Sequence, residues 1–149
     1  MQGVMRGVLM GVGCALVMGA PAAPCAAAGK YAIILQAGKE SHEGMARAVH
    51  ALLYARELKA HGHAVVLFFD GAGTEGAEEL TNPETNSKLR PAYEHLKEAG
   101  VVEVICDACA GAFGVKAKLA ERNQPLLAEY EGHPSIAKWA DAGYQLVIL

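Results

Sequence analysis

Two cysteines that stand three residues apart, Cys106 and Cys109, are the residues of this sequence best suited to covalent chemistry. Cys106 ends the mainly apolar run 101–106, which predicts a buried strand, and a helix is expected to begin beside Cys109. Backbone N–H groups at a helix start favour the thiolate, which is the nucleophilic and sulfur-accepting form of cysteine. The spacing therefore predicts a reactive thiol pair, although Asp107 places an opposing negative charge between the two thiols.

Three other interpretations of the cysteine pair stay open at this stage. Free cysteines often serve as small buried hydrophobes, and an oxidising compartment would join such a pair in a structural disulfide. A zinc site would need two further ligands, which His42 and His133 could supply from predicted loops. Because the sequence holds no second C-x-x-C and no H-x-x-x-H, we expect no bound metal and no other cofactor.

Strands and helices are predicted to alternate along the chain from residue 30 to its end. The apolar runs 30–35 and 64–69 are typical of strands buried on both faces, and a third strand is expected over 101–106. A fourth, short strand is expected at 125–129 and the last strand at 144–149. Helices are expected over residues 41–61, 91–100, 109–123 and 135–143. This order predicts an α/β fold, a single domain whose sheet of about five mainly parallel strands carries helices on both faces.

The segment 72–85 shows no strong core pattern, and we expect a loop there, with Glu75, Glu78 and Glu79 facing water. In the helix expected over residues 109–123, the packed face is predicted to hold Phe113, Val115 and Leu119. The solvated face of the same helix is predicted to hold Lys116, Lys118 and Arg122. In the helix expected over residues 41–61, the packed positions are Met45, Ala48, Val49, Leu52 and Ala55.

Ligands of parallel α/β sheets bind beyond the carboxyl ends of the strands. That rule selects the segments 36–43, 70–73, 106–111 and 130–135 as the working edge of the sheet. The candidate ligand-binding residues in these segments are Gln36, His42, Asp70, Gly111 and His133.

The first 28 residues differ in composition from the rest of the chain. Arg6 is their only charged residue, an apolar stretch covers residues 7–20, and Pro21 and Pro24 precede small residues. This pattern predicts a signal peptide, or else an N-terminal anchor that is not cleaved. We therefore expect a periplasmic or otherwise exported protein with a folded domain over residues 29–149, which contacts the membrane only if the segment is retained.

Composition excludes several classes of protein. The chain has 149 residues, of which 52% are hydrophobic and 19% charged, so it suits one folded domain and not a disordered chain. Its formal net charge of -3 leaves no basic excess to neutralise a phosphate backbone, so we expect no nucleic-acid partner. Neither a phosphate-binding G-x-x-x-x-G-K-[ST] loop nor a G-x-S-x-G elbow is present.

Three parts of the sequence resemble the DsrE/DsrF-like family. They are residues 104–116 (VICDACAGAFGVK), residues 129–135 (EYEGHPS), and the pair Gly143 and Tyr144 before the last strand. The resemblance covers nearly all of residues 30–149 and implies a small flavodoxin-like domain that forms trimers or hexamers. It also implies a sulfur-relay role, in which a cysteine at the end of a central strand carries a persulfide and exchanges sulfur with a donor or acceptor protein.

Cys106 matches the persulfide position of the relay proteins, whereas Cys109 is an additional cysteine that many of them lack. Relay members are cytosolic, and the N-terminal segment here suggests export. The leading hypothesis is a thiol-based sulfur-handling protein with Cys106 as the acceptor and Cys109 as a resolving or assisting thiol. The alternatives are a non-catalytic oligomeric binding module with a structural disulfide, and a Cys/His metal site.

Overall fold

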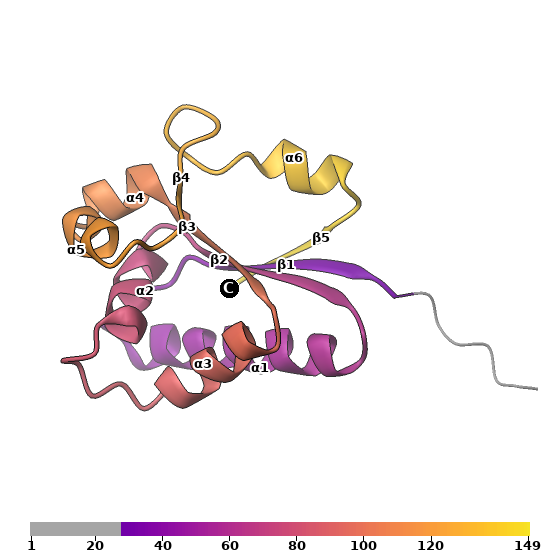
Figure 1. Ribbon diagram of the computed structural model, residues 1–149, viewed down its shortest axis with the longest axis horizontal. Helices are drawn as coiled ribbons and strands as arrows, with labels where there is room; N and C mark the ends of the chain where they lie inside the picture. Colours follow the sequence, from indigo (N-terminus) through magenta and orange to yellow (C-terminus); the bar gives the residue numbers. More distant parts are fainter. Residues whose placement is uncertain (1–27) are drawn as a thin grey trace, which may run out of the picture.

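A computed structural model describes residues 28–149 and shows one five-stranded sheet in which every paired strand runs parallel (Figure 1). The strand order is β4-β3-β2-β1-β5. The strands are β1 (Lys30–Leu35), β2 (Ala64–Phe69), β3 (Val102–Cys106), β4 (Leu126–Leu127) and β5 (Gln145–Ile148). The α/β class and the parallel five-stranded sheet expected of a flavodoxin-like domain are thereby confirmed.

Six helices accompany the sheet within residues 28–149. They are α1 (His42–Ala60), α2 (Gly73–Thr81), α3 (Arg90–Glu98), α4 (Asp107–Ala112), α5 (Lys116–Glu121) and α6 (Ile136–Asp141). Ser41 caps α1, since its hydroxyl oxygen accepts a hydrogen bond from the Gly44 N–H at 2.9 Å. Ser135 caps α6 in the same manner. Both N-caps lie where the sequence places them.

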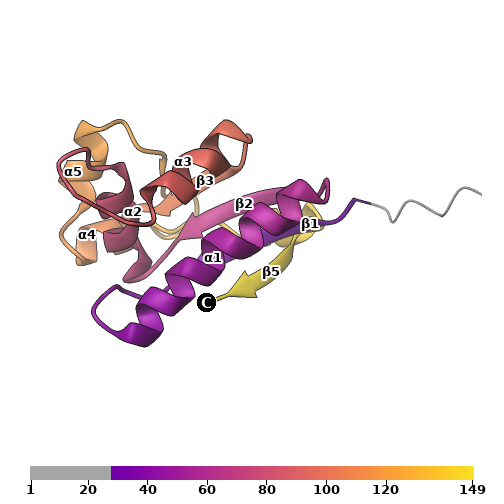
Figure 2. The same ribbon diagram turned by 90° about the horizontal axis from the view of Figure 1, so that it is seen from below.

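The two faces of the sheet are covered unequally (Figures 1 and 2). Side chains of α1 to α5 pack with Ile33, Leu67 and Ile105 in one large cluster. On the other face, α6 covers a smaller cluster in which the rings of Trp139 and Phe68 lie 5.4 Å apart. Helices therefore lie on both faces, as predicted, but a single short helix covers the second one.

The prediction of a loop over residues 72–85 is wrong for residues 73–81, which form α2. The sequence gives little sign of this nine-residue helix, because it has few large apolar side chains and its buried positions include Thr74 and Ala77. Glu78 is also buried, and not solvated as predicted, because its carboxylate pairs with the guanidinium of Arg122 at 2.9 Å. The same ion pair removes Arg122 from the solvated face expected of the following helix.

The single helix predicted over residues 109–123 is in fact two helices. The chain breaks at Gly114, whose φ of +71° is a left-handed conformation that favours glycine. Val115 and Leu119 are buried as predicted, but the break carries Phe113 away from the packed face and leaves it 42% exposed.

Two smaller expectations also need correction. In α1, Leu52 and Ala55 are buried as expected, whereas Met45 and Val49 lie mostly at the surface. The fourth strand is limited to Leu126–Leu127, since it pairs only with the last two residues of β3.

The predicted signal peptide or anchor falls on residues 1–27, which lie outside the described part of the chain. Within residues 28–149, no helix has both the length and the apolar character that crossing a membrane requires.

The buried carboxyl of Glu103 on β3 leads to a prediction about how the stability of the fold depends on pH. Burial raises the pKa of Glu103 above its ordinary value of 4.5, and its contacts with Tyr93 and Lys97 offset this only in part. The Tyr93 hydroxyl lies 2.8 Å from both carboxylate oxygens. Because the folded protein holds this proton more tightly than the unfolded chain, the contribution of Glu103 to stability is greatest below pH 4.5 and falls as the pH rises through the raised pKa.

We therefore expect Glu103→Gln, which keeps the side-chain shape and removes the titration, to gain stability relative to the native protein as the pH rises. Urea unfolding of both proteins at about pH 4 and about pH 7 measures this difference. An unchanged difference between the two pH values would contradict the prediction.

Candidate functional site

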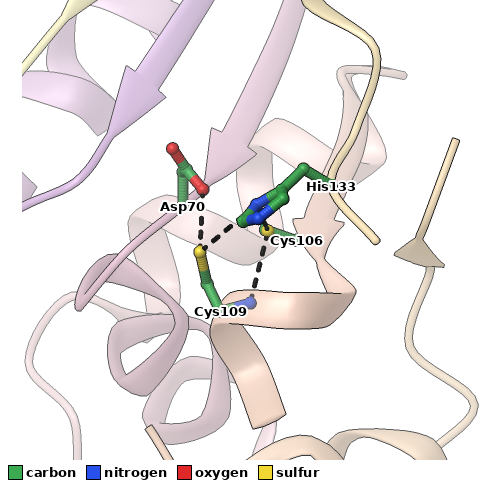
Figure 3. Close-up of side chains that lie close together, drawn as sticks. All are labelled: Asp70, Cys106, Cys109 and His133. Atoms are coloured by element: carbon green, nitrogen blue, oxygen red, sulfur yellow. Dashed lines mark hydrogen bonds between the residues drawn. The ribbon is translucent and has the colours of Figure 1, made fainter. Parts of the chain in front are cut away.

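Four side chains that could do chemistry meet at the carboxyl edge of the sheet (Figure 3). Cys106 ends β3, Cys109 lies in α4, Asp70 follows β2, and His133 lies in the segment between β4 and α6. Their ligand atoms, the two Sγ atoms, one imidazole nitrogen and one carboxylate oxygen, all lie within 4.8 Å of one another. The parallel pairing of β2 with β3 accounts for the meeting of Asp70 and the cysteines, because both strands end at the same edge.

Cys106 lies at the base of this cluster and is fully buried. Its Sγ atom lies 3.2 Å from Nδ1 of His133 and accepts a hydrogen bond from the backbone N–H of Cys109 at 3.4 Å. Burial raises the pKa of the Cys106 thiol to about 12, and the neighbouring Asp70 and Cys109 side chains act in the same direction. The sequence left open whether the helix start or opposing effects decide the pKa of this thiol, and at Cys106 burial outweighs the backbone N–H.

Cys109 is the more accessible of the two cysteines. Its thiol donates to Oδ1 of Asp70 at 3.2 Å, and its Sγ atom lies 3.8 Å from Nδ1 of His133. Both cysteines are free thiols in this structure. A solvent-borne reagent therefore meets the sulfur of Cys109 before that of Cys106.

Asp70 is held between Cys109 and the Gln36 amide, which donates to its Oδ2 atom at 2.8 Å. Partial burial works to raise the pKa of Asp70, but hydrogen bonds from Gln36, Cys109 and the Gly71 N–H outweigh it and keep that pKa below its ordinary value. Asp70 is thus a carboxylate at neutral pH, and Gln36 fixes its orientation.

A tight turn presents His133 to the cysteines. Tyr130 and His133 exchange two backbone hydrogen bonds of 2.8 Å, and the two residues between them, Glu131 and Gly132, both have positive φ. That is the arrangement of a two-residue hairpin turn, in which glycine is favoured. The Gly132 carbonyl also accepts the Ala108 N–H at 2.9 Å, so the turn is joined directly to α4.

The structure brings together some of the predicted site residues and not others. Asp70, Cys106, Cys109 and His133 converge, and Gln36 contacts the cluster through Asp70. His42 is an exposed residue at the start of α1, and it is absent from the cluster formed by the described residues, so the Cys2His2 combination considered from sequence does not form. Gly111 lies exposed in α4 and contributes no side chain.

Two electrostatic features of the site were not foreseen. The carboxylate of Asp107 pairs with the ammonium group of Lys116 at 2.7 Å, which compensates its charge and reduces its effect on the two thiols. The thiol of Cys109 instead bonds to Asp70, and the only sequence signal for this contact is an acidic residue directly after the strand that precedes β3.

Comparison with known sequences assigns the chain to a family. The sequence model of the DsrE/DsrF-like family matches residues 29–148, which include every residue of the cluster. The chain belongs to the DsrE/DsrF-like family. The resemblance noted in residues 104–116 and 129–135 is thereby confirmed.

Relatives of this DsrE/DsrF-like protein include the uncharacterized protein MJ0733 of Methanocaldococcus jannaschii. The two are 34% identical over 101 residues, which are 68% of this chain and 78% of the relative. Among solved structures, a conserved protein of unknown function from Bacteroides thetaiotaomicron, BT1422, superposes with a TM-score of 0.53. That comparison covers 80% of this chain and 94% of the other at 13% identity, and it shows the fold alone.

Proposed function

We propose that this DsrE/DsrF-like protein handles sulfur as a persulfide on its cysteine pair. The observation that carries the proposal is the convergence of two free thiols, an imidazole and a carboxylate at the sheet edge of a DsrE/DsrF-like domain. The family resemblance implies a sulfur-relay role for that edge. The cysteine of β3 has the position that the family resemblance assigns to the sulfur carrier.

The different burial of the two sulfurs suggests separate roles, with Cys109 accepting sulfur first and Cys106 retaining it. Cys109 gives up its thiol proton to solvent, its thiolate attacks the outer sulfur of a donor persulfide, and the donor leaves as a thiolate. His133 takes the proton of Cys106 through Nδ1, and the resulting thiolate attacks the outer sulfur on Cys109. Cys109 leaves as a thiolate, and the sulfur then rests on the buried Cys106, where few acceptors can reach it.

The same pair has a second chemical outcome. If the Cys109 thiolate attacks the inner sulfur of the Cys106 persulfide, the outer sulfur leaves as hydrosulfide and the two cysteines form a disulfide. This step consumes no external oxidant, because the persulfide sulfur is itself reduced. The protein would then release sulfide, and its Cys106–Cys109 disulfide would have to be reduced before another cycle.

Intact-mass spectrometry after incubation with an inorganic polysulfide tests the proposed function. The chain should carry Cys14→Ser and Cys25→Ser, so that only Cys106 and Cys109 can react. We expect an added mass of one or more sulfur atoms that a reductant removes. Failure to gain sulfur under these conditions would sink the proposal, and a mass lower by two hydrogens would favour the disulfide alternative. On native material, the observed N-terminus also tests the proposed export.

We also propose that the protein forms the trimers or hexamers that its family resemblance implies. The sheet face that carries α6 supports this, because the helix leaves part of it uncovered. On that face, Ile148 and Val102 are 59% and 52% exposed. Light scattering should report a trimer or hexamer, and Ile148→Asp should shift it towards a smaller species. Leu53→Asp, at an exposed position on α1, provides the control. A monomeric native protein at working concentration would contradict the proposal.

A further inference from the structure

We propose that Asp70, Cys106, Cys109 and His133 form a four-coordinate site for Zn²⁺. Such binding goes beyond persulfide chemistry, since it needs no sulfur donor and no turnover. It would give the cysteine pair a second state, in which both sulfurs are held by a metal ion.

The donor atoms are of the types that Zn²⁺ prefers. Two cysteine sulfurs separated by two residues form the half-site common to structural zinc centres, and histidine nitrogen and aspartate oxygen complete the sets found in tetrahedral sites. Each of the four residues offers one atom, so the number of ligands is four and no further side chain is required. Hard cations such as Mg²⁺ and Ca²⁺ prefer all-oxygen sites, so this mixture of sulfur, nitrogen and oxygen disfavours them.

The distances between the donor atoms fit a tetrahedron around one ion. Ligands placed at zinc bond lengths in tetrahedral geometry lie about 3.3–3.8 Å from one another. Sγ of Cys106 lies 3.2 Å and Sγ of Cys109 lies 3.8 Å from Nδ1 of His133. Sγ of Cys109 lies 3.2 Å from Oδ1 of Asp70, and every pair lies within 4.8 Å. Small side-chain rotations therefore suffice to admit the ion.

Neighbouring groups hold the donors in place, as is usual around metal sites. The Gln36 amide fixes the Asp70 carboxylate through the oxygen that does not face Cys109. The Cys109 N–H bonds to the sulfur of Cys106. The Gly132 carbonyl joins the turn that carries His133 to α4. Three separate segments are thus fixed relative to one another before any ion arrives.

Access and charge are also suitable. Cys106 is buried at the base, Asp70 and Cys109 are half-buried, and His133 is exposed, so an ion can approach from the histidine side. Two thiolates and one carboxylate carry three negative charges, of which Zn²⁺ neutralises two while displacing the two thiol protons. Because the metal uses the same sulfur electron pairs as persulfide formation, the zinc-bound and sulfur-loaded states exclude each other.

The test uses the full chain with Cys14→Ser and Cys25→Ser, reduced and without any sulfur donor. Zn²⁺ is titrated in competition with a chromogenic chelator, and Co²⁺ serves as the spectroscopic probe of the same site. We expect one ion per chain, a thiolate-to-cobalt charge-transfer band and the intense visible absorption of tetrahedral Co²⁺. Loss of an outer-shell partner typically weakens metal binding by about 10-fold to 100-fold. Cys106→Ser, Cys109→Ser and His133→Asn each remove a ligand, so each should weaken Zn²⁺ binding by more than that.

The matched control is His42→Asn, which alters a histidine outside the cluster and should bind Zn²⁺ as the native chain does. Native affinity in His133→Asn, a stoichiometry other than one, or a cobalt spectrum without tetrahedral absorption would each overturn the inference. Sulfur loading is measured separately with a chelator present. A chain that loads sulfur without binding zinc therefore contradicts only this inference, and one that binds zinc without loading sulfur contradicts only the proposed function.

Discussion

Cys106→Ser should abolish the sulfur that the protein retains after exposure to polysulfide. Serine nearly matches cysteine in size, so the buried position at the end of β3 stays filled and the domain stays folded. A hydroxyl cannot form the sulfur–sulfur bond of a persulfide, and sulfur left on the accessible Cys109 is open to acceptors, so we expect the fraction that stays loaded in the presence of a small thiol acceptor to fall by about 100-fold or more. Intact-mass spectrometry after removal of excess polysulfide and brief exposure to that acceptor measures the fraction, again with Cys14 and Cys25 replaced.

Cys109→Ser provides the comparison that gives this result its meaning. Because Cys109 is the accessible thiol, its loss should prevent a protein-bound donor from loading Cys106, while a dissolved polysulfide should still bring the loaded fraction close to native. Native loading in Cys106→Ser would show that the buried thiol is not the carrier. Variants that change stability alone, with no sulfur on the native chain either, would favour the binding-module hypothesis.

Gly73→Ala should destabilise the fold severely. A methyl group at this position would lie 2.1 Å from the carbonyl oxygen of Leu35, so it would clash with the backbone at the end of β1. The clashing atoms belong to the Leu35 backbone, which cannot move away as the end of a flexible side chain could. We expect a loss of about 3 kcal/mol or more in the free energy of unfolding, at the upper end of what overpacking costs. The Gly73 N–H also bonds to the Asp70 carbonyl, so the displacement would reach the cluster directly.

Gly76→Ala is the matched control for this prediction, because it makes the same change in the same helix. Apart from its chain neighbours and the backbone of its own helix, no atom lies within 4 Å of a methyl group built there, so only the helix propensity of alanine should act. We expect a gain of about 0.5–1 kcal/mol. Urea unfolding compares both variants with the native chain, and a Gly73→Ala protein as stable as Gly76→Ala would refute the steric argument.

The regular part of the fold could be predicted because its signals are local. Three apolar runs mark the central strands, and Ser41 and Ser135 mark the helix starts they cap. The helix α2 could not be predicted in this way, because its burial depends on a distant partner. Glu78 is buried only because Arg122, 44 residues further along the chain, reaches it.

The candidate site was predictable in its members and less so in its chemistry. The C-x-x-C spacing identifies the thiols, and the sheet-edge rule selects Asp70 and His133. The same rule also selects His42, because it identifies the loops at the carboxyl edge without showing which of their side chains face the thiols. The run 101–106 indicates a buried strand, but only the structure shows that burial outweighs the backbone N–H and raises the pKa of Cys106.

The different depths of the two sulfurs make the cluster selective by the size of what approaches it. Because Cys106 has no exposed surface, a dissolved polysulfide ion would reach it only when the His133 side chain moves aside. Under the proposed function, a persulfide held on another protein is too bulky for that route and would deliver sulfur only to Cys109. The protein would thus distinguish a diffusible sulfur source from a docked one by steric reach alone, without any pocket that recognises the donor.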